Sequence, residues 1–260
     1  MNSLNLSVDE LIFCFYSEGY FEQGIALKET YYPDLDDTEL QFLLEVATRS
    51  LLAKDLLVEE AHRYKLKKDY KNFIHVLNNA ERSIKASKFT QNLSEEESIT
   101  IHYLNNEAYL HFLQYDHQVH SISAIKTEQV MGKISEFFNS PSLETNEKII
   151  FQISDDEFEN LLEEASTGSS SNIPVTFQQN DEFEEFQHDV KNRKGKMDSL
   201  LNMKYSNQNL PEFLDICFII PGRINSWMIN KNMENGGYII QKANEPSIER
   251  LILNNYSSIS

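Results

Sequence analysis

The sequence predicts an α+β protein with two pseudo-symmetric halves, in which an antiparallel sheet is flanked by helical bundles and the N-terminal part is winged-helix-like. Three observations support this fold class. Apolar residues recur first at helical spacing and then in alternation, this order of elements is repeated, and 40% of the 260 residues are hydrophobic. Such a chain is long and apolar enough to bury a core.

Helices are predicted to open the first half, residues 1–140. Ser7 and Glu10 have the spacing of a capping box, so a helix should begin there and end near Gly19. A second helix is expected from about Asp37, because five apolar residues follow at helical spacing. These residues are Leu40, Leu43, Leu44, Ala47 and Leu51.

A hairpin and an antiparallel meander should follow in the same half. The hairpin is expected over residues 56–66 and a third helix over 70–84, after which the apolar period changes to that of a strand. A closing helix should end before Pro141. The three strands are expected over 99–103, 108–115 and 119–125.

The second half, residues 147–260, repeats this order in shortened form. Ser154 and Glu157 give another capping box, helices are expected around Phe186 and Leu251, and three strands lie between these two helices. The strands are expected over 214–220, 224–229 and 238–241. We expect this half to lack the hairpin and the third helix of the first, the Thr167–Ser171 segment to be a mobile loop, and the two halves to form one compact domain.

The composition is strongly acidic. With 23 Lys and Arg against 41 Asp and Glu, the formal net charge is −18. Nucleic acids and bare anionic membranes are therefore unexpected partners, because cationic side chains supply most of the affinity for both. The sequence has neither an apolar run of about 18 residues nor the pattern of a signal peptide. Its two cysteines give no disulfide framework, so we expect a soluble, cytoplasmic protein.

No enzyme, cofactor or metal site is predicted. Asp116, His117 and His120 could hold a zinc ion, but they also fit partly exposed positions at strand edges, and no further ligand completes the set. Cys14 and Cys217 lie in apolar segments and are expected to be inert. No phosphate-binding, dinucleotide-binding or hydrolase motif is present.

The winged-helix outline raises the alternative of a transcriptional regulator. Five basic residues gather near the predicted hairpin: Arg63, Lys65, Lys67, Lys68 and Lys71. The helix before the hairpin would have to present cations or amides to a DNA groove, yet its polar positions mix acidic and basic residues. The pattern therefore favours a winged-helix shape used for contact with another protein.

Side chains on the predicted strands suggest a face that binds a partner. Tyr109, Leu113 and Tyr115 share one side of a strand in the first half, and Trp227 and Ile229 share one in the second. We predict that these five residues contact the partner, because Tyr and Trp often dominate protein interfaces. A place in the core is the alternative. If they form an interface, Trp227→Ala should weaken binding and leave the circular dichroism spectrum unchanged.

The layout resembles the EspG-type chaperones of type VII secretion, most clearly in the first half. The resemblance is carried by the Leu-rich segment 50–58, by the helix that follows Leu66, and by the shortened repeat of the half. It implies a cytosolic, non-enzymatic adaptor that binds the helical-hairpin tip of a secreted protein. In the best-known branch of that family the clients are PE–PPE pairs.

The composition departs from that branch, since this chain is rich in Asn, Lys and Glu instead of Ala, Arg and Gly. We therefore expect a helical client of the WXG or LXG type. A strongly acidic α+β protein could also be an immunity protein that fills the basic cleft of a toxin. The sequence indicates neither the oligomeric state nor which family residues would touch the client.

Overall fold

The computed structural model describes residues 3–139, 148–168, 181–205, 211–233 and 236–253. These residues form eight α-helices, one short 3₁₀ helix and twelve strands, and seven pairs of neighbouring strands are antiparallel. The predicted α+β class is therefore confirmed. Within the described residues, no helix combines the length and the apolar character needed to cross a membrane.

The chain divides into two compact units. The first consists of Met1–Ser83, Ile99–Thr127 and Tyr205–Leu210, and the second of Ile84–Ser98, Glu128–Lys204 and Pro211–Ser260. Each unit therefore collects segments that are distant in the sequence. The predicted break at residues 140–147 and most of the predicted loop Thr167–Ser171 lie outside the described residues.

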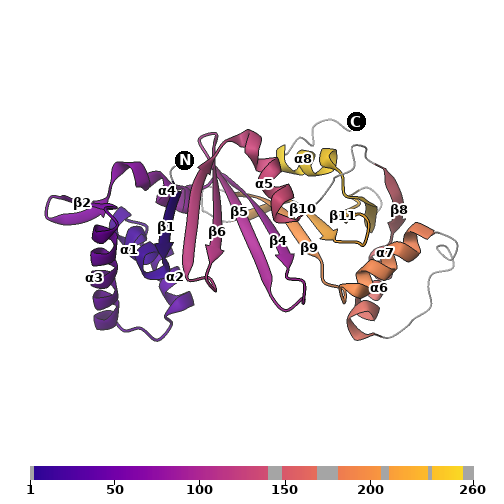
Figure 1. Cartoon of the computed structure of the whole chain (residues 1–260), viewed down its shortest axis with the longest axis horizontal. Helices are drawn as coiled ribbons and strands as arrows, with labels where there is room; N and C mark the ends of the chain where they lie inside the picture. The colour runs from indigo at the N-terminus through magenta and orange to yellow at the C-terminus, as the bar shows by residue number, and fades with distance from the viewer. Residues whose placement is uncertain (1–2, 140–147, 169–180, 206–210, 234–235, 254–260) are drawn as a thin grey trace. The chain divides into compact units, whose positions relative to one another are not determined.

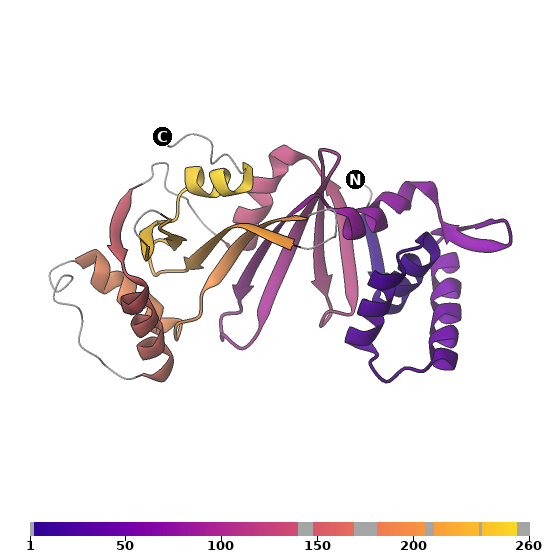
Figure 2. The ribbon, with the colours of Figure 1, turned by 180° about the vertical axis from the view of Figure 1, so that it is seen from behind.

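The first unit holds the N-terminal helices, a separate hairpin and four strands of the large sheet (Figure 1). Its elements are β1 (Ser3–Ser7), α1 (Val8–Glu18), α2 (Phe21–Tyr31), α3 (Asp37–Ala53), β2 (Leu57–Glu60), β3 (Arg63–Leu66), α4 (Lys68–Asn79), most of β5 (Glu96–Leu104), β6 (Glu107–Gln114) and β7 (Val119–Ile125). The far end of the hairpin of β2 and β3 projects away from the helices in both views (Figure 2). The order of α1 to α3 followed by this hairpin agrees with the predicted winged-helix-like part.

The second unit holds the remaining strands of the large sheet and four helices. Its elements are most of β4 (Arg82–Phe89), α5 (Val130–Phe137), β8 (Ile149–Ile153), α6 (Asp155–Thr167), α7 (Asp181–Asn192), β9 (Asp198–Tyr205), β10 (Pro211–Ile220), β11 (Trp227–Lys231), β12 (Tyr238–Lys242) and α8 (Glu245–Leu253). The 3₁₀ helix Thr127–Gln129 precedes α5.

The large sheet repeats one strand order, read inward from each of its two edges. One series reads β1-β7-β6-β5-β4, and the other reads β8-β12-β11-β10-β9. In each, the first strand leads into a capped helix and pairs with the last strand of the meander. This order agrees with two pseudo-symmetric halves. The second half was predicted to lack the hairpin and the third helix, and one part of this is corrected. The helix α7 precedes the meander of the second half as α4 precedes that of the first. Within its described residues, the second half instead lacks counterparts of α2, α3 and the hairpin.

The helix α1 forms the centre of the first unit, where it contacts α2, α3, α4, β1, β3 and β7. It begins at the predicted capping box, where the Glu10 carboxylate accepts the Ser7 N–H at 2.8 Å, and it ends at Gly19, whose φ of 88° suits glycine. Glu10 is only 1% exposed, and it also accepts the Ser50 hydroxyl and the Lys54 ammonium, both at 2.7 Å. Burial alone would raise the pKa of Glu10, but these hydrogen bonds outweigh it and lower the pKa. A paired buried carboxylate thus fastens α3 to α1.

Three histidines lie next to one another across β5, β6 and β7. The ring centroids of His102 and His111 are 5.7 Å apart, and those of His111 and His120 are 5.3 Å apart. The His111 Nε2 and His120 Nδ1 atoms are 3.0 Å apart, and the Ser83 hydroxyl lies 2.7 Å from His102 Nδ1. His120 is therefore a buried member of this row, while His117 is exposed in the β6–β7 turn. No group of three metal-ligating side chains is found among the residues that the structure describes.

This row should make the fold sensitive to acid. Burial lowers the pKa of His102 to about 4, of His111 to about 3 and of His120 to about 4, and the neighbouring histidines add to the shift of His111. The unfolded chain takes up these protons near pH 6.5, whereas the folded chain resists them until about pH 4. Stability should therefore fall with decreasing pH through this window, by roughly 1.4 kcal/mol per pH unit for each histidine.

His111→Phe tests this prediction in urea denaturation between pH 6.5 and 4. In this variant the slope of unfolding free energy against pH should be smaller by the equivalent of about one proton. His62→Phe, which changes a histidine whose side chain is fully exposed, should keep the wild-type slope. Equal slopes for wild type and His111→Phe would contradict the assignment.

Candidate functional site

The five residues predicted to bind a partner do not form one exposed face. Tyr109, Leu113 and Tyr115 belong to the first unit, and Trp227 and Ile229 to the second. Tyr109, Trp227 and Ile229 are buried, with exposures of 4%, 0% and 0%. For these three, the predicted surface position is wrong, because they pack inward from their strands. Leu113 is half-buried and Tyr115 is 76% exposed, so contact through these two stays a prediction.

Trp227 is a core residue that fixes the start of β11. Its ring packs edge-on against Phe186 of α7, with the ring centroids 5.3 Å apart. The indole N–H donates a hydrogen bond of 2.9 Å to the carboxylate of Asp189, which is 3% exposed. The ammonium of Lys242 lies over the same ring and also pairs with Glu185 at 3.1 Å. Trp227 is thus held on several sides by α7 and β12.

This arrangement supports the loop between β10 and β11, residues 221–226. A Cβ atom at Gly222 would lie 2.4 Å from the Asp189 carboxylate, 2.4 Å from the Asn225 carbonyl oxygen and 3.2 Å from Trp227 Nε1. Gly222 therefore lies directly on the Trp227–Asp189 pair, where no other residue fits without a shift of the backbone. Two residues further along, Ile224 is 66% exposed.

The loop forms one wall of a hollow of about 490 Å³ within the second unit, here called the loop groove. The other walls come from the β4–β5 turn, the end of α5, and the segment from α7 to β9. The residues that line it are Lys88, Phe89, Thr90, Gln91, Glu97, Phe138, Asn139, Arg193, Asp198, Pro221, Gly222, Arg223, Ile224, Asn225 and Ser226. Three cations and two carboxylates in this set make the groove locally basic in an otherwise acidic protein.

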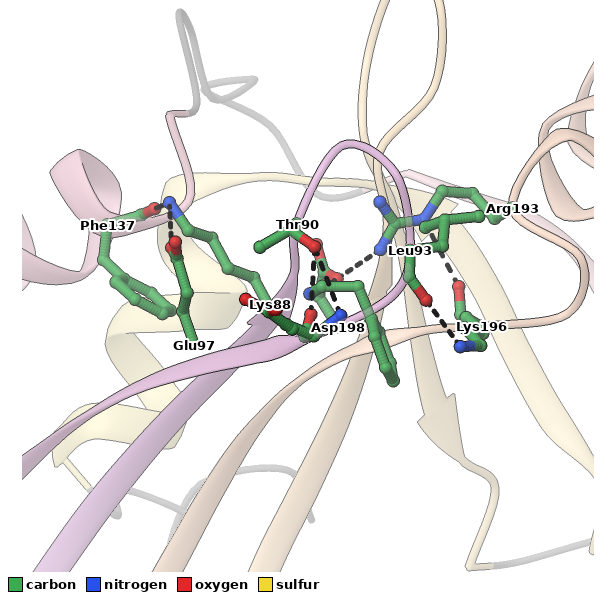
Figure 3. Close-up of polar contacts among 10 residues, drawn as sticks. Lys88, Thr90, Leu93, Glu97, Phe137, Arg193, Lys196 and Asp198 are labelled. Carbon is green, nitrogen blue, oxygen red and sulfur yellow. Dashed lines mark hydrogen bonds and ion pairs between the residues drawn. The ribbon is translucent and has the colours of Figure 1, made fainter. Parts of the chain in front are cut away.

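Asp198 is the buried polar centre beneath the groove (Figure 3). Its carboxylate accepts the Phe89 N–H at 2.9 Å and pairs with the Arg193 guanidinium, which donates a second bond to the Lys196 carbonyl. Burial raises the pKa of Asp198, while the Phe89 amide and the charges of Arg193 and Lys88 oppose the shift. These contacts join β4, β9 and the segment after α7.

Two lysines hold the β4–β5 turn and α5 in place (Figure 3). The Lys196 ammonium donates to the Leu93 carbonyl at 2.6 Å, and the Lys88 ammonium donates to the Phe137 carbonyl at 2.7 Å. Lys88 also lies 3.6 Å from the Glu97 carboxylate. The groove is therefore a braced hollow, and both of its carboxylates are paired with cations.

Neither cysteine lines the loop groove. Cys14 and Cys217 are fully buried, and burial raises the pKa of both, that of Cys217 to about 12. The thiolate is the nucleophilic form of cysteine, so these groups are unreactive at neutral pH. The lining of the loop groove offers apolar contact surface beside positively charged side chains.

Comparison with known proteins places the chain in a family. The sequence model of the family described as "Uncharacterised protein YfjC" matches residues 3–252. The chain belongs to this family. It is also 39% identical over 239 residues to the protein "Uncharacterized protein YfjC" of Bacillus subtilis (strain 168), a match that covers 90% of this chain and 93% of the relative.

A solved structure shares the fold of this YfjC-family chain. It is the structure of the Mycobacterium tuberculosis type VII secretion system chaperone EspG5 in complex with a PE25–PPE41 dimer. The match has a TM-score of 0.56 at 7% identity and covers 97% of this chain and 94% of the other. At this identity the likeness is one of fold, and to that extent it agrees with the resemblance in the sequence.

The loop groove itself was missed in the sequence. The Pro221–Gly222 pair signals a turn, but nothing in the order of residues indicates that Asp189, 38 positions before Trp227, lies beneath it. The available signal was a glycine five residues before the single tryptophan of the chain. It acquires meaning only when α7 and β11 are seen in contact.

Trp227→Ala should unfold or strongly destabilise the second unit. It removes a fully buried indole and leaves the Asp189 carboxylate without a donor, so we expect a loss of about 3–5 kcal/mol in unfolding free energy. Trp227→Phe keeps a ring and should lose about 1–3 kcal/mol. Urea denaturation followed by circular dichroism measures both. Wild-type stability of Trp227→Ala would restore this residue as a surface contact.

Proposed function

We propose that this chain is a non-enzymatic chaperone or adaptor, which binds a helical type VII secretion substrate and shields its apolar tip before export. The main support is the likeness of fold to the EspG5 chaperone structure, which extends over 97% of the chain. That chaperone is in complex with a PE25–PPE41 dimer. For the present chain we propose a helical client of the WXG or LXG type, because its composition differs from that of PE–PPE chaperones.

The loop groove offers a suitable place for such a tip. Ile224 is exposed at its rim and also lines a second hollow of about 270 Å³, so an apolar side chain stands between two recesses. Phe138 and Pro221 add apolar surface, and Arg223 adds an exposed cation. This combination is complementary to an apolar tip that carries acidic residues.

The chain's overall charge also suits a chaperone role. A formal charge of −18 keeps a protein soluble while it carries an apolar patch and repels other acidic proteins. Binding by contact alone would need no cofactor and no reactive side chain.

Co-expression with the helical secretion substrates of the same organism tests the proposal. We expect one of them to form a complex in size-exclusion chromatography and to remain soluble only with this chain. Ile224→Asp should weaken that complex at least about tenfold, because it places a charge in the apolar contact. Arg223→Glu should weaken it less and reduce its dependence on salt.

Met233→Asp is the matched control. Met233 is 89% exposed in the same unit and lines neither hollow, so this variant should bind the client as the wild type does. Thermal unfolding must show that all variants are folded. Complexes with none of the substrates, or equal losses for Ile224→Asp and Met233→Asp, would contradict the proposal. Tight binding to a basic toxin domain instead would indicate an immunity protein.

A further inference from the structure

The helix α3 of the first unit leaves large apolar side chains exposed. Of its 17 residues, only Ala47 and Leu51 are buried. Phe42 is 63% exposed and Val46, one turn later, is 39% exposed. Both overall views show the other helices of this unit on one side of α3 (Figures 1 and 2). A helix that leaves apolar side chains this exposed is typical of a contact surface.

This stripe borders a groove of about 690 Å³, here called the α3 groove. The apolar part of its lining comes from the end of α2, the α2–α3 connection and α3 itself. These residues are Tyr32, Leu35, Phe42, Leu43 and Val46. The groove lies wholly within the first unit and shares no residue with the loop groove.

The rim of the α3 groove is acidic. Asp9 and Glu39 line it, and the described residues of its lining include no Lys or Arg. Asp36 and Asp37 precede Glu39 at the start of α3. Asp36 caps the helix by accepting the Thr38 and Glu39 N–H groups at 2.8 and 2.9 Å. The Glu39 carboxylate in turn accepts the Asp36 N–H at 3.1 Å, so the capping box holds this side chain at the rim of the apolar hollow.

We propose that the α3 groove binds an amphipathic helix of another protein, with apolar residues at i, i+3, i+4 and i+7 and Lys or Arg beside them. Apolar anchors would enter the groove between Phe42 and Tyr32, and the cations would meet Asp9 and Glu39. Helix-in-groove recognition uses this spacing of anchors, and opposite charges at the rim select the partner. The inference does not depend on the function proposed for the loop groove.

Other occupants of the groove are disfavoured by charge. A second copy of this chain also carries −18, so like charges would meet at the rim. The segments outside the described residues contain no Lys or Arg, so they could not supply the cations.

DNA is disfavoured for the same reason, although α3 precedes a hairpin as a recognition helix does in a winged helix. The one basic residue of α3, Arg49, pairs with Glu45 at 3.3 Å, and the helix also carries Asp37 and Glu39. A DNA-reading helix would need free cations or amides on its exposed face.

A labelled synthetic peptide of about 15 residues tests the inference by fluorescence anisotropy with the full chain. The probe carries Leu at i, i+3, i+4 and i+7, Lys at flanking positions and Ala elsewhere. Phe42→Ala and Val46→Ser should each weaken binding at least about tenfold. Glu39→Gln should weaken it about threefold, and more at low salt than at high salt. A probe with Glu in place of Lys should bind at least about tenfold more weakly.

Phe213→Ala is the matched control, because Phe213 is 68% exposed in the other unit. It should bind the probe as the wild type does. Equal binding by Phe42→Ala and wild type, or equal affinity for the Lys and Glu probes, would overturn the inference. So would a Phe42-dependent dimer in sedimentation, or Phe42-dependent binding of duplex DNA. Loss of the substrate complex in Ile224→Asp with unchanged peptide binding would separate the two surfaces.

Discussion

Buried carboxylates must be paired, and such pairs support both the loop groove and the α3 groove. A carboxylate removed from water is tolerated only when donors surround it. Glu10 meets this requirement through Ser7, Ser50 and Lys54, and in doing so fastens α3 to α1. Asp189 and Asp198 meet it through Trp227 and Arg193, and in doing so support the loop groove. In each unit, an exposed apolar patch rests on a polar contact that is too costly to break.

The two surfaces differ in the charge that surrounds their apolar side chains. The loop groove has three cations against two carboxylates, whereas the α3 groove has two carboxylates and, among its described lining, no cation. A single client with an acidic tip and a basic amphipathic helix could satisfy both. Two different partners could do so as well, and each would be kept from the wrong groove by like charge. The two proposed contact surfaces are therefore chemically distinct.

Much of the fold could be predicted from the sequence, because periodicity and caps are local. The capping boxes at Ser7 and Ser154 and the β5–β7 meander were predicted where the structure has them. The strands β4 and β9 were missed because several of their buried positions are polar, namely Ser83 and Ser87 in β4 and Asn202 in β9. The surface position of Trp227 was wrong for a related reason. Alternation fixes which residues share a side of a strand, but the helix that covers that side comes from elsewhere in the chain.

The fit of Gly222 over the Trp227–Asp189 pair also has a consequence for evolution and engineering. The position that anchors the loop cannot accept a side chain, whereas its neighbours Arg223 and Ile224 are exposed and can vary. In the proposed chaperone role, specificity could therefore be redesigned by changing two adjacent residues while the buried contacts beneath them stay the same. The residue that anchors the loop would then be separate from the residues that contact the client.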